Sequence, residues 1–216
     1  GETITEAASG GTDVVSIVTT TNFANMSAAS FNEIEEIRFA GANQTATFTS
    51  GQLTGEALQL NETATGTSNL VITVGSGETA TFATMTAGTF TSGSDTLTIN
   101  ANTGNETITG PNIATTINAG TGNDTITGSE GDDTLRGDAG DDTFIAGASG
   151  GAGDDHIDGG AGVDLADYSD LSADLTVDLT AGTVSSAESG SDTITNTENI
   201  DAGAGNDTIT GDDQSN

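Results

Sequence analysis

Residues 119–145 read Ala119-Gly-Thr-Gly-Asn-Asp-Thr-Ile-Thr127, then Gly128-Ser-Glu-Gly-Asp-Asp-Thr-Leu-Arg136, then Gly137-Asp-Ala-Gly-Asp-Asp-Thr-Phe-Ile145. The three segments align without a gap at a period of nine residues. In each of them position four is glycine, position six is aspartate and position eight is a large apolar residue. A fixed period of this kind indicates a solenoid that is built from one repeated unit.

The same frame continues on both sides of this stretch. Further units cover residues 101–109, 110–118, 150–158, 159–167 and 202–210, with residues 146–149 inserted. The apolar residues at position eight are Ile108, Ile117, Ile126, Leu135, Phe144, Ile157 and Ile209. A flexible Gly/Asp-rich linker has no need of a register in both its acids and its apolar residues, so the pattern favours a folded solenoid.

Each unit predicts a short strand that follows a tight turn. Thr125-Ile-Thr127 places one apolar side chain inward between two outward threonines. Glycine at positions two and four allows positive φ and close approach of the backbone. Two units make one coil of 18 residues with a strand on each side, so residues 18 apart stack about 4.8 Å from each other. We therefore expect an all-β protein, a parallel β-roll of the β-solenoid type.

This stacking places the position-six aspartates in two columns. One column holds Asp124, Asp142 and, after the insertion, Asp164, and the opposite column holds Asp133 and Asp155. Two carboxylates about 4.8 Å apart repel by roughly 0.9 kcal/mol even in water, and by more beside protein. Calcium fits such columns, because it takes roughly six to eight oxygen ligands and accepts both carboxylates and backbone carbonyls.

The repeat resembles the RTX (repeats-in-toxin) nonapeptide, a calcium-binding unit. The resemblance covers residues 101–167 and, in part, residues 193–216. It implies a right-handed parallel β-roll with several calcium ions between successive turns, each held by position-six carboxylates and turn carbonyls. Carried over to this chain, the metal ligands are Asp124, Asp133, Asp142, Asp155, Asp164 and Asp207, in turns that contain Gly120, Gly122, Gly131, Gly140, Gly151, Gly153, Gly160, Gly162, Gly203 and Gly205.

Several units depart from the pattern. Unit 110–118 has Pro111 at position two and Thr115 at position six, so we expect no regular calcium site there. Glu106 replaces aspartate in the first unit, and its longer side chain argues against a regular site. The acids at position five, expected to contribute only backbone carbonyls or solvated charge, are Asp132, Asp141 and Asp154.

The regions outside the frame read as further β-structure. Residues 168–200 interrupt the roll within 101–216, and we expect a wider coil of the same solenoid. Residues 1–100 are rich in Thr, Ala and Gly and predict a β-solenoid with few or no calcium sites, with a β-sandwich as the alternative. Phe90 and Ile99 extend the nine-residue spacing backward from Ile108. The predicted segments are strands at 13–18, 35–39, 45–49, 70–74 and 96–100 and a short helix or turn at 26–34.

Composition limits the partners. The 216 residues include 33 acids and only two basic residues, for a net charge of −31. Nucleic acid is excluded, because phosphate contacts need a basic surface. Cysteine is absent, so neither a disulfide nor a thiolate ligand is available. No apolar run approaches the roughly 18 residues of a membrane span, and no signal peptide is visible after Gly1.

Catalysis has little support in the sequence. The one histidine, His156, cannot form the clustered ligand set of a zinc hydrolase, and a Ser–His–Asp triad would also depend on it. The many acids are already accounted for by the repeat. We therefore expect a protein that is not an enzyme.

The combination of RTX repeats with a Thr/Ala/Gly-rich first half is similar to bacterial surface-layer proteins and large RTX adhesins. The resemblance implies a secreted, extracellular structural protein of the bacterial cell surface, assembled into a lattice or filament or bound to cell-surface polysaccharide. The alternative is the C-terminal secretion and folding module of a type I-secreted enzyme, toxin or adhesin.

Overall fold

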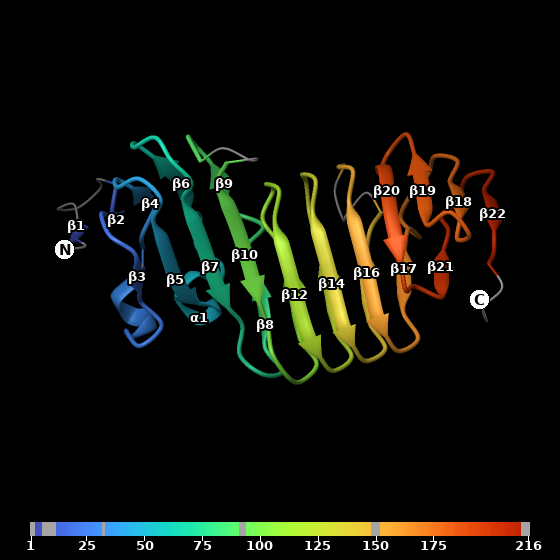
Figure 1. Cartoon of the computed structure of the whole chain (residues 1–216), viewed down its shortest axis with the longest axis horizontal. Helices are drawn as coiled ribbons and strands as arrows, with labels where there is room; N and C mark the ends of the chain where they lie inside the picture. The colour runs from blue at the N-terminus through green and yellow to red at the C-terminus, as the bar shows by residue number, and fades with distance from the viewer. Residues whose placement is uncertain (1–2, 6–11, 32, 91–93, 148–151, 213–216) are drawn as a thin grey trace.

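The computed structural model describes residues 3–5, 12–31, 33–90, 94–147 and 152–212. They form an elongated solenoid whose coils follow one another along the long axis (Figure 1). Its strands belong to three sheets, called A, B and C below. The all-β fold with parallel strands that the repeat predicts is confirmed.

Sheet B is the wall that runs through both halves of the chain. Its strands, in spatial order, are β3 (Thr21–Asn22), β5 (Thr45–Thr49), β7 (Asn69–Thr73), β10 (Thr96–Asn100), β12 (Thr116–Thr121), β14 (Thr134–Ala139), β16 (His156–Ala161), β20 (Gly190–Thr195), β19 (Thr183–Ser186), β18 (Thr176–Asp178) and β22 (Thr208–Thr210). Because sheet B crosses residue 100 without a break, the two halves share one hydrogen-bonded wall.

The other two sheets divide the chain between them. Sheet A serves the N-terminal half and contains β1 (Thr3–Thr5), β2 (Val14–Ile17), β4 (Glu36–Phe39), β6 (Gln59–Glu62) and β9 (Thr86–Ala87). Sheet C serves the C-terminal half and contains β8 (Thr79–Thr81), β11 (Thr107–Thr109), β13 (Thr125–Thr127), β15 (Thr143–Ile145), β17 (Leu165–Asp167) and β21 (Asn199–Asp201). A short 3₁₀ helix (Ala28–Phe31) and α1 (Ser50–Leu53) complete the described elements. None of the helices described is long and apolar enough to cross a membrane.

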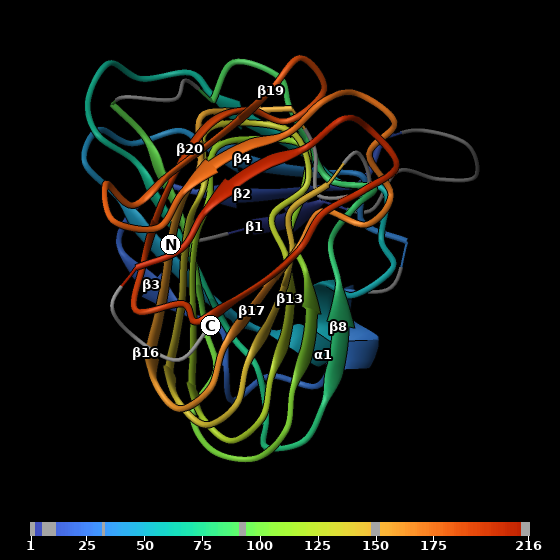
Figure 2. The ribbon, with the colours of Figure 1, turned by 90° about the vertical axis from the view of Figure 1, so that its right-hand side faces the viewer.

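The coils differ in length between the halves. In β5 and β7, Phe48 pairs with Ile72, so one coil takes 24 residues. In β12 and β14, Ile117 pairs with Leu135, so one coil takes the 18 residues that two nonapeptides supply. Viewed along the axis, the short coils stack closely, with β16 and β17 on opposite walls (Figure 2).

The nine-residue spacing does not continue backward as predicted from Phe90. Ile99 does take its place in β10 and pairs with Ile117. Phe90 lies outside the strands and packs on Phe39 of β4, with ring centroids 5.8 Å apart. The reason is that the coils before β10 are longer, so an apolar residue nine positions earlier falls in a connecting segment.

Residues 168–200 were expected to form a wider coil of the same solenoid, and Ile157 of β16 pairs in parallel with Ile194 of β20, so this coil takes 37 residues. Strands β18, β19 and β20 form an antiparallel meander within sheet B. Strand β20 pairs in parallel with β16, while β22 pairs with β18 on the far side of the meander. The meander therefore separates the last repeat from the others.

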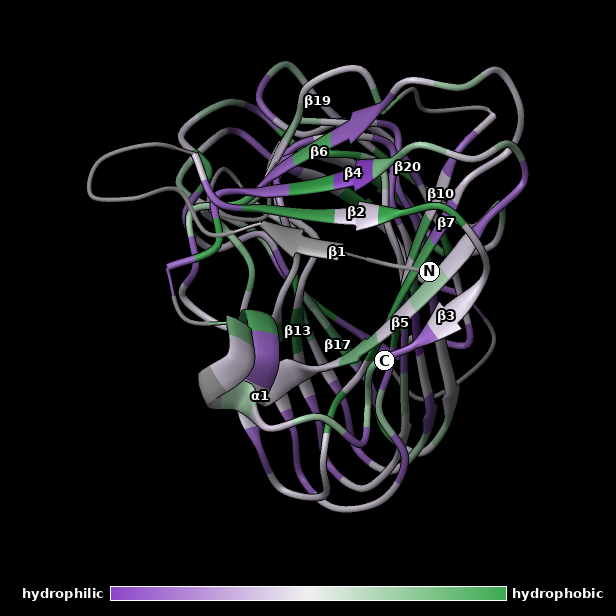
Figure 3. Cartoon of the chain, turned by 90° about the vertical axis from the view of Figure 1, so that its left-hand side faces the viewer, coloured by the Kyte–Doolittle hydropathy of each residue, from purple (hydrophilic) through white to green (hydrophobic). Residues whose placement is uncertain are grey.

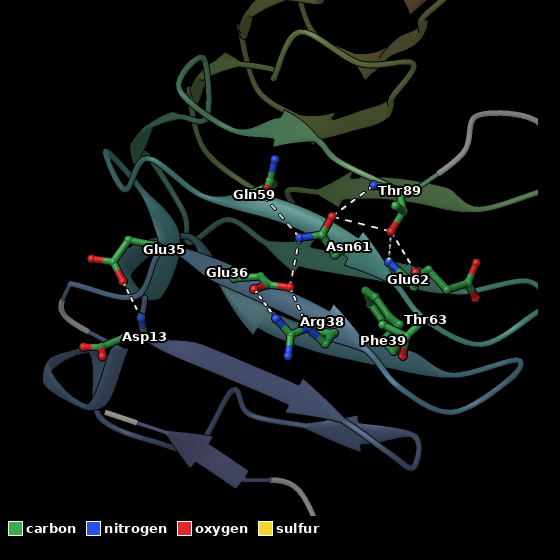
Figure 4. Close-up of polar contacts among 10 residues, drawn as sticks. All are labelled: Asp13, Glu35, Glu36, Arg38, Phe39, Gln59, Asn61, Glu62, Thr63 and Thr89. Atoms are coloured by element: carbon green, nitrogen blue, oxygen red, sulfur yellow. Dashed lines mark hydrogen bonds and ion pairs between the residues drawn. The ribbon is translucent and has the colours of Figure 1, made fainter. Parts of the chain in front are cut away.

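The N-terminal core is aromatic. Phe48 stacks on Phe23 at 4.7 Å between ring centroids and meets Phe31 edge-on at 5.4 Å. Along β4, inward apolar residues alternate with outward polar ones (Figure 3). The outward polar residues are paired (Figure 4), because Arg38 binds Glu36 at 2.6 Å and Asn61 Nδ2 donates to Glu36 Oε1 at 2.9 Å.

The two-sided part of the roll has a thin core. Ile117, Leu135 and Ile157 line sheet B, and Ile126 and Phe144 face them from sheet C; all five are fully buried. Each of these five strands thus contributes one large apolar side chain, as the spacing of position eight predicts. The prediction does not hold at Ile209, which is 52% exposed in β22, and β17 contributes only Ala166.

Candidate metal centre

Two edges of the roll carry its turns. Turns that lead from sheet B to sheet C form the lower edge in Figure 1, and turns that lead from sheet C to sheet B form the upper edge. Each position-six residue ends a turn just before the next strand, so consecutive turns on one edge bring these residues into a row.

The lower edge carries the first column of carboxylates. Asp124 Oδ1 accepts the N–H of Glu106 at 2.7 Å, Asp142 Oδ1 accepts that of Asp124 at 2.8 Å, and Asp164 Oδ1 accepts that of Asp142 at 2.8 Å. Glu198 Oε2 continues the row by accepting the N–H of Asp164 at 2.9 Å. One oxygen of each acid therefore ties its coil to the preceding one.

The upper edge carries the second column, built in the same way. Asp133 Oδ1 accepts the N–H of Thr115 at 2.7 Å, and Asp155 Oδ1 accepts that of Asp133 at 2.8 Å. Asp192 Oδ1 then accepts the N–H of Asp155 at 3.1 Å. The stacking of aspartates predicted from the nine-residue period is present on both edges.

Five acids of the two columns have a second carboxylate oxygen with no protein partner. The buried, unpaired carboxylate oxygens are Oε2 of Glu106 and Oδ2 of Asp124, Asp133, Asp142 and Asp164. A buried polar atom without a partner is costly, and a buried charge more so, unless a counter-ion compensates it. The unpaired carboxylate oxygens of the two columns therefore fit a bound cation.

Burial also disturbs the ionisation of the columns. It raises the pKa of Asp133 to about 8, and the negative charge of Asp155 adds to the effect. Burial likewise raises the pKa of Asp155 to about 7 and that of Asp142 to about 6. A bound cation would remove this penalty, because an opposite charge favours the ionised carboxylate.

Glycine lets backbone carbonyls approach the same rows. Gly122 has φ +137°, and a Cβ there would lie only 1.4 Å from the carbonyl oxygen of Gly104 in the preceding coil. At Gly140 the corresponding contact is with the carbonyl oxygen of Gly122, at 1.8 Å. Only glycine permits this approach, so the glycine of each turn lies directly against a carbonyl oxygen of the preceding turn on the same edge.

The donor set fits calcium. In the part of the chain that is described, no three acidic or histidine side chains converge on one point. Ligands beyond the column carboxylates must therefore be backbone carbonyls, and calcium accepts this mixture of hard oxygens. Individual ligand assignments for the six aspartates stay predictions.

The position-five acids do more than was expected of them. Asp141 Oδ1 accepts the N–H of Val163 at 3.0 Å, and Asp132 Oδ1 accepts that of Asp154 at 3.1 Å. These side chains are exposed and tie their coil to the following one. They are therefore structural links between coils rather than only solvated charge.

Two of the predicted site residues are not part of the two columns. Asp207 accepts the N–H of Leu175 at 2.9 Å, and the meander separates it from Asp155 and Asp192. Gly151 lies outside the described residues. Gly120 and Gly160 lie near the ends of β12 and β16. The other predicted glycines lie in turns that stack on a neighbouring coil: Gly122, Gly131, Gly140, Gly153, Gly162, Gly203 and Gly205.

Thr115 and Glu106 behave differently from each other. Thr115 brings no carboxylate, as expected, and its N–H ends the second column. Glu106 was expected to disturb the pattern, yet it occupies the first column in register and is 1% exposed. The longer side chain is accommodated because its Oε1 reaches the N–H of Gly77 in the preceding coil.

Sequence reasoning missed Asp192 and Glu198. Asp192 stands at position six of a unit whose Gly190 is at position four and whose Ile194 is at position eight, so the frame could have revealed it. Its Oδ2 accepts the hydroxyl proton of Tyr168 at 2.9 Å, which closes the second column with a protein partner. Glu198 is the last residue of the three-residue turn between β20 and β21, and it stands at position six of residues 193–201, which precede unit 202–210 in register with Ile200 at position eight.

Comparison with known families agrees with this geometry. Residues 114–144, 148–167 and 195–216 match the family described as RTX calcium-binding nonapeptide repeat (4 copies). Repeats of this family bind several calcium ions per array. No curated protein and no solved structure matches the chain.

Proposed function

Since this chain is a calcium-binding RTX-repeat protein, we propose that it is a structural protein of the bacterial cell surface, part of a surface layer or filament. Calcium folds and stiffens its C-terminal roll, and the stiffness extends to the N-terminal half. RTX-repeat proteins are generally secreted, which supports an extracellular location.

The continuous sheet B carries this proposal. Its eleven strands run from β3 to β22, so ions bound along the roll act on a wall that both halves share. A rod of this kind suits a load-bearing role outside the cell. Calcium bound at the two edges would also reduce the net charge of −31, which otherwise opposes both folding and contact between copies.

A non-enzymatic role is part of the proposal. His156 lies on the outer face of β16, where its Nδ1 makes a hydrogen bond with Thr193 Oγ1 at 2.8 Å. The buried acids of the roll belong to the two columns, where one oxygen of each accepts a backbone N–H. Within the described residues, we therefore assign His156 and the buried acids of the roll to stacking and calcium binding rather than to catalysis.

The second candidate is a secretion and folding module of a larger type I-secreted enzyme, toxin or adhesin. The calcium-free chain would then stay unfolded until it meets extracellular calcium, because metal binding and folding would be one event. This reading accounts for the roll equally well but assigns no assembly role to the N-terminal solenoid.

Assembly separates the two candidates. The purified chain is followed by light scattering and electron microscopy in millimolar calcium, in millimolar magnesium and in EDTA. The structural role predicts ordered sheets or filaments in calcium alone. A chain that folds in calcium but stays monomeric at every concentration would favour the secretion module and contradict the structural role.

A further inference from the structure

Glu106 occupies the point where the solenoid changes from long coils to short ones. Its turn, residues 101–106, lies between the turn before β8 and the turn before β13, since β11 pairs with both strands. It precedes the first residues that match the RTX family, which begin at position 114. The family match therefore assigns no calcium site to it.

The carboxylate of Glu106 is buried and half satisfied. Its Oε1 accepts the N–H of Gly77, and its own N–H donates to Asp124 Oδ1 at 2.7 Å. Its Oε2 is buried and has no partner. The same arrangement, one oxygen paired and one free, is found at the aspartates of the regular repeats.

Asp124 supplies the other half of a site. It is 2% exposed, and its Oδ2 also lacks a partner. Its Oδ1 accepts the N–H of Glu106, so the two acids lie in adjacent turns of the same edge. Two adjacent buried carboxylates, each with one unpaired oxygen, need either a shared proton or a cation between them.

A backbone carbonyl oxygen lies on the same, lower edge of the roll. The carbonyl oxygen of Gly104 lies against Gly122, where a Cβ would be 1.4 Å away. The stacking of turn 101–106 on the following turn is thus the same as that between the later turns, where a Cβ at Gly140 would lie 1.8 Å from the carbonyl oxygen of Gly122.

We propose that the first calcium ion of the lower edge binds between Glu106 and Asp124, one coil before the matched repeats, with turn carbonyls as its further ligands. Through the bond from Gly77, this ion links the roll to the N-terminal solenoid. The inference rests on the proposed calcium-dependent roll and deepens it, because it places an ion at the boundary of the two halves.

The test is a count of bound calcium ions by equilibrium dialysis and native mass spectrometry. Glu106→Gln keeps an oxygen for the Gly77 N–H but removes the charge, so it should bind one ion fewer than the wild-type chain. Glu130→Gln makes the same chemical change at an exposed position of the 128–136 unit and should bind the wild-type number. An unchanged count in Glu106→Gln would overturn the inference.

A second variant distinguishes the loss of this one site from misfolding of the chain. Glu106→Asp restores the acid found at position six of the regular repeats, so it should fold in calcium and bind the wild-type number of ions. One ion fewer in folded Glu106→Asp would overturn the inference. A wild-type chain that binds no calcium would contradict the proposed function itself, which distinguishes that failure from the loss of this one site.

Discussion

The two halves of the solenoid share one sheet but hold successive coils together by different means. In the N-terminal half the coils are long, and six of the seven phenylalanines lie there. Phe23, for example, packs against both Phe31 and Phe48 in the core of these coils. The buried acid Glu36 is paired with Arg38, so its charge is compensated within the protein.

The C-terminal half has the opposite composition. Its 18-residue coils leave room for one large apolar side chain per strand, so less apolar surface is buried to offset the entropy of ordering the chain. Its buried acids have neighbours of the same sign: Glu106, Asp124, Asp133, Asp142, Asp155, Asp164 and Asp192. The comparison teaches that a coil too narrow for a substantial hydrophobic core can still be stable if cations bind along its edges.

The largest effect is expected in the aromatic core. Replacing Phe48 by Ala removes a fully buried ring and should cost about 3–5 kcal/mol in the free energy of unfolding of the N-terminal half. Because this core needs no metal, the loss should be the same in calcium and in EDTA. Thermal unfolding followed by circular dichroism in both conditions measures it.

A matched substitution in the roll sharpens this contrast. Ile126 is also fully buried, and Ile126→Ala should cost about 2–5 kcal/mol when calcium is bound. In EDTA at pH 9 we expect the roll to be unfolded already, so there the same substitution should change nothing. An equal cost for Ile126→Ala in both conditions would show that the roll does not depend on calcium.

The next effect concerns two neighbouring aspartates. Asp142→Asn and Asp141→Asn each keep the side-chain oxygen that accepts a backbone N–H, and each removes one negative charge. Only Asp142 has a buried second oxygen without a partner. Asp142→Asn should therefore weaken calcium binding at least tenfold, about 1.4 kcal/mol, whereas Asp141→Asn should change it little. Titration calorimetry compares the two, and equal losses would contradict the assignment.

The smallest effect is a pH dependence of the calcium-free chain. Burial raises the pKa of Asp133 from 3.8 to about 8 and that of Asp155 to about 7, so the folded roll binds more protons than the unfolded chain. Its stability should then fall as the pH rises from about 4 through 8 and level off above. In EDTA, more β-signal should be present at pH 5 than at pH 9.

A salt control separates this effect from the overall charge. General repulsion between surface acids is screened at high ionic strength, whereas the desolvation of buried carboxylates persists. The difference between pH 5 and pH 9 should survive in 1 M salt. Its disappearance there would assign the pH dependence to surface repulsion instead.

Much of the roll could be predicted because its period repeats in register. The frame from residue 101 predicts the two columns of aspartates and the single apolar residue per strand. The strands β5 and β10 were predicted with their observed bounds, since each alternates polar and apolar residues. Glycine at position four was predicted from the need for close approach, which Gly122 illustrates.

The remainder depends on contacts that no local pattern encodes. Strands β6, β8 and β9 are short, and they pair with neighbours more than 20 residues away, so the long coils of the N-terminal half were not foreseen. The place of Glu106 depends on Gly77, which lies 29 residues earlier. Asp192 lies within the interruption at residues 168–200, in a unit that is out of phase with the earlier units.

Hydrogen exchange followed by mass spectrometry tests the central contrast most directly, because it reports the stability of each region separately. In calcium, amides of residues 36–73 and of residues 107–167 should both be protected. In EDTA, we expect residues 36–73 to stay protected and residues 107–167 to exchange rapidly. Protection of both regions in EDTA, or loss of both together, would contradict the account.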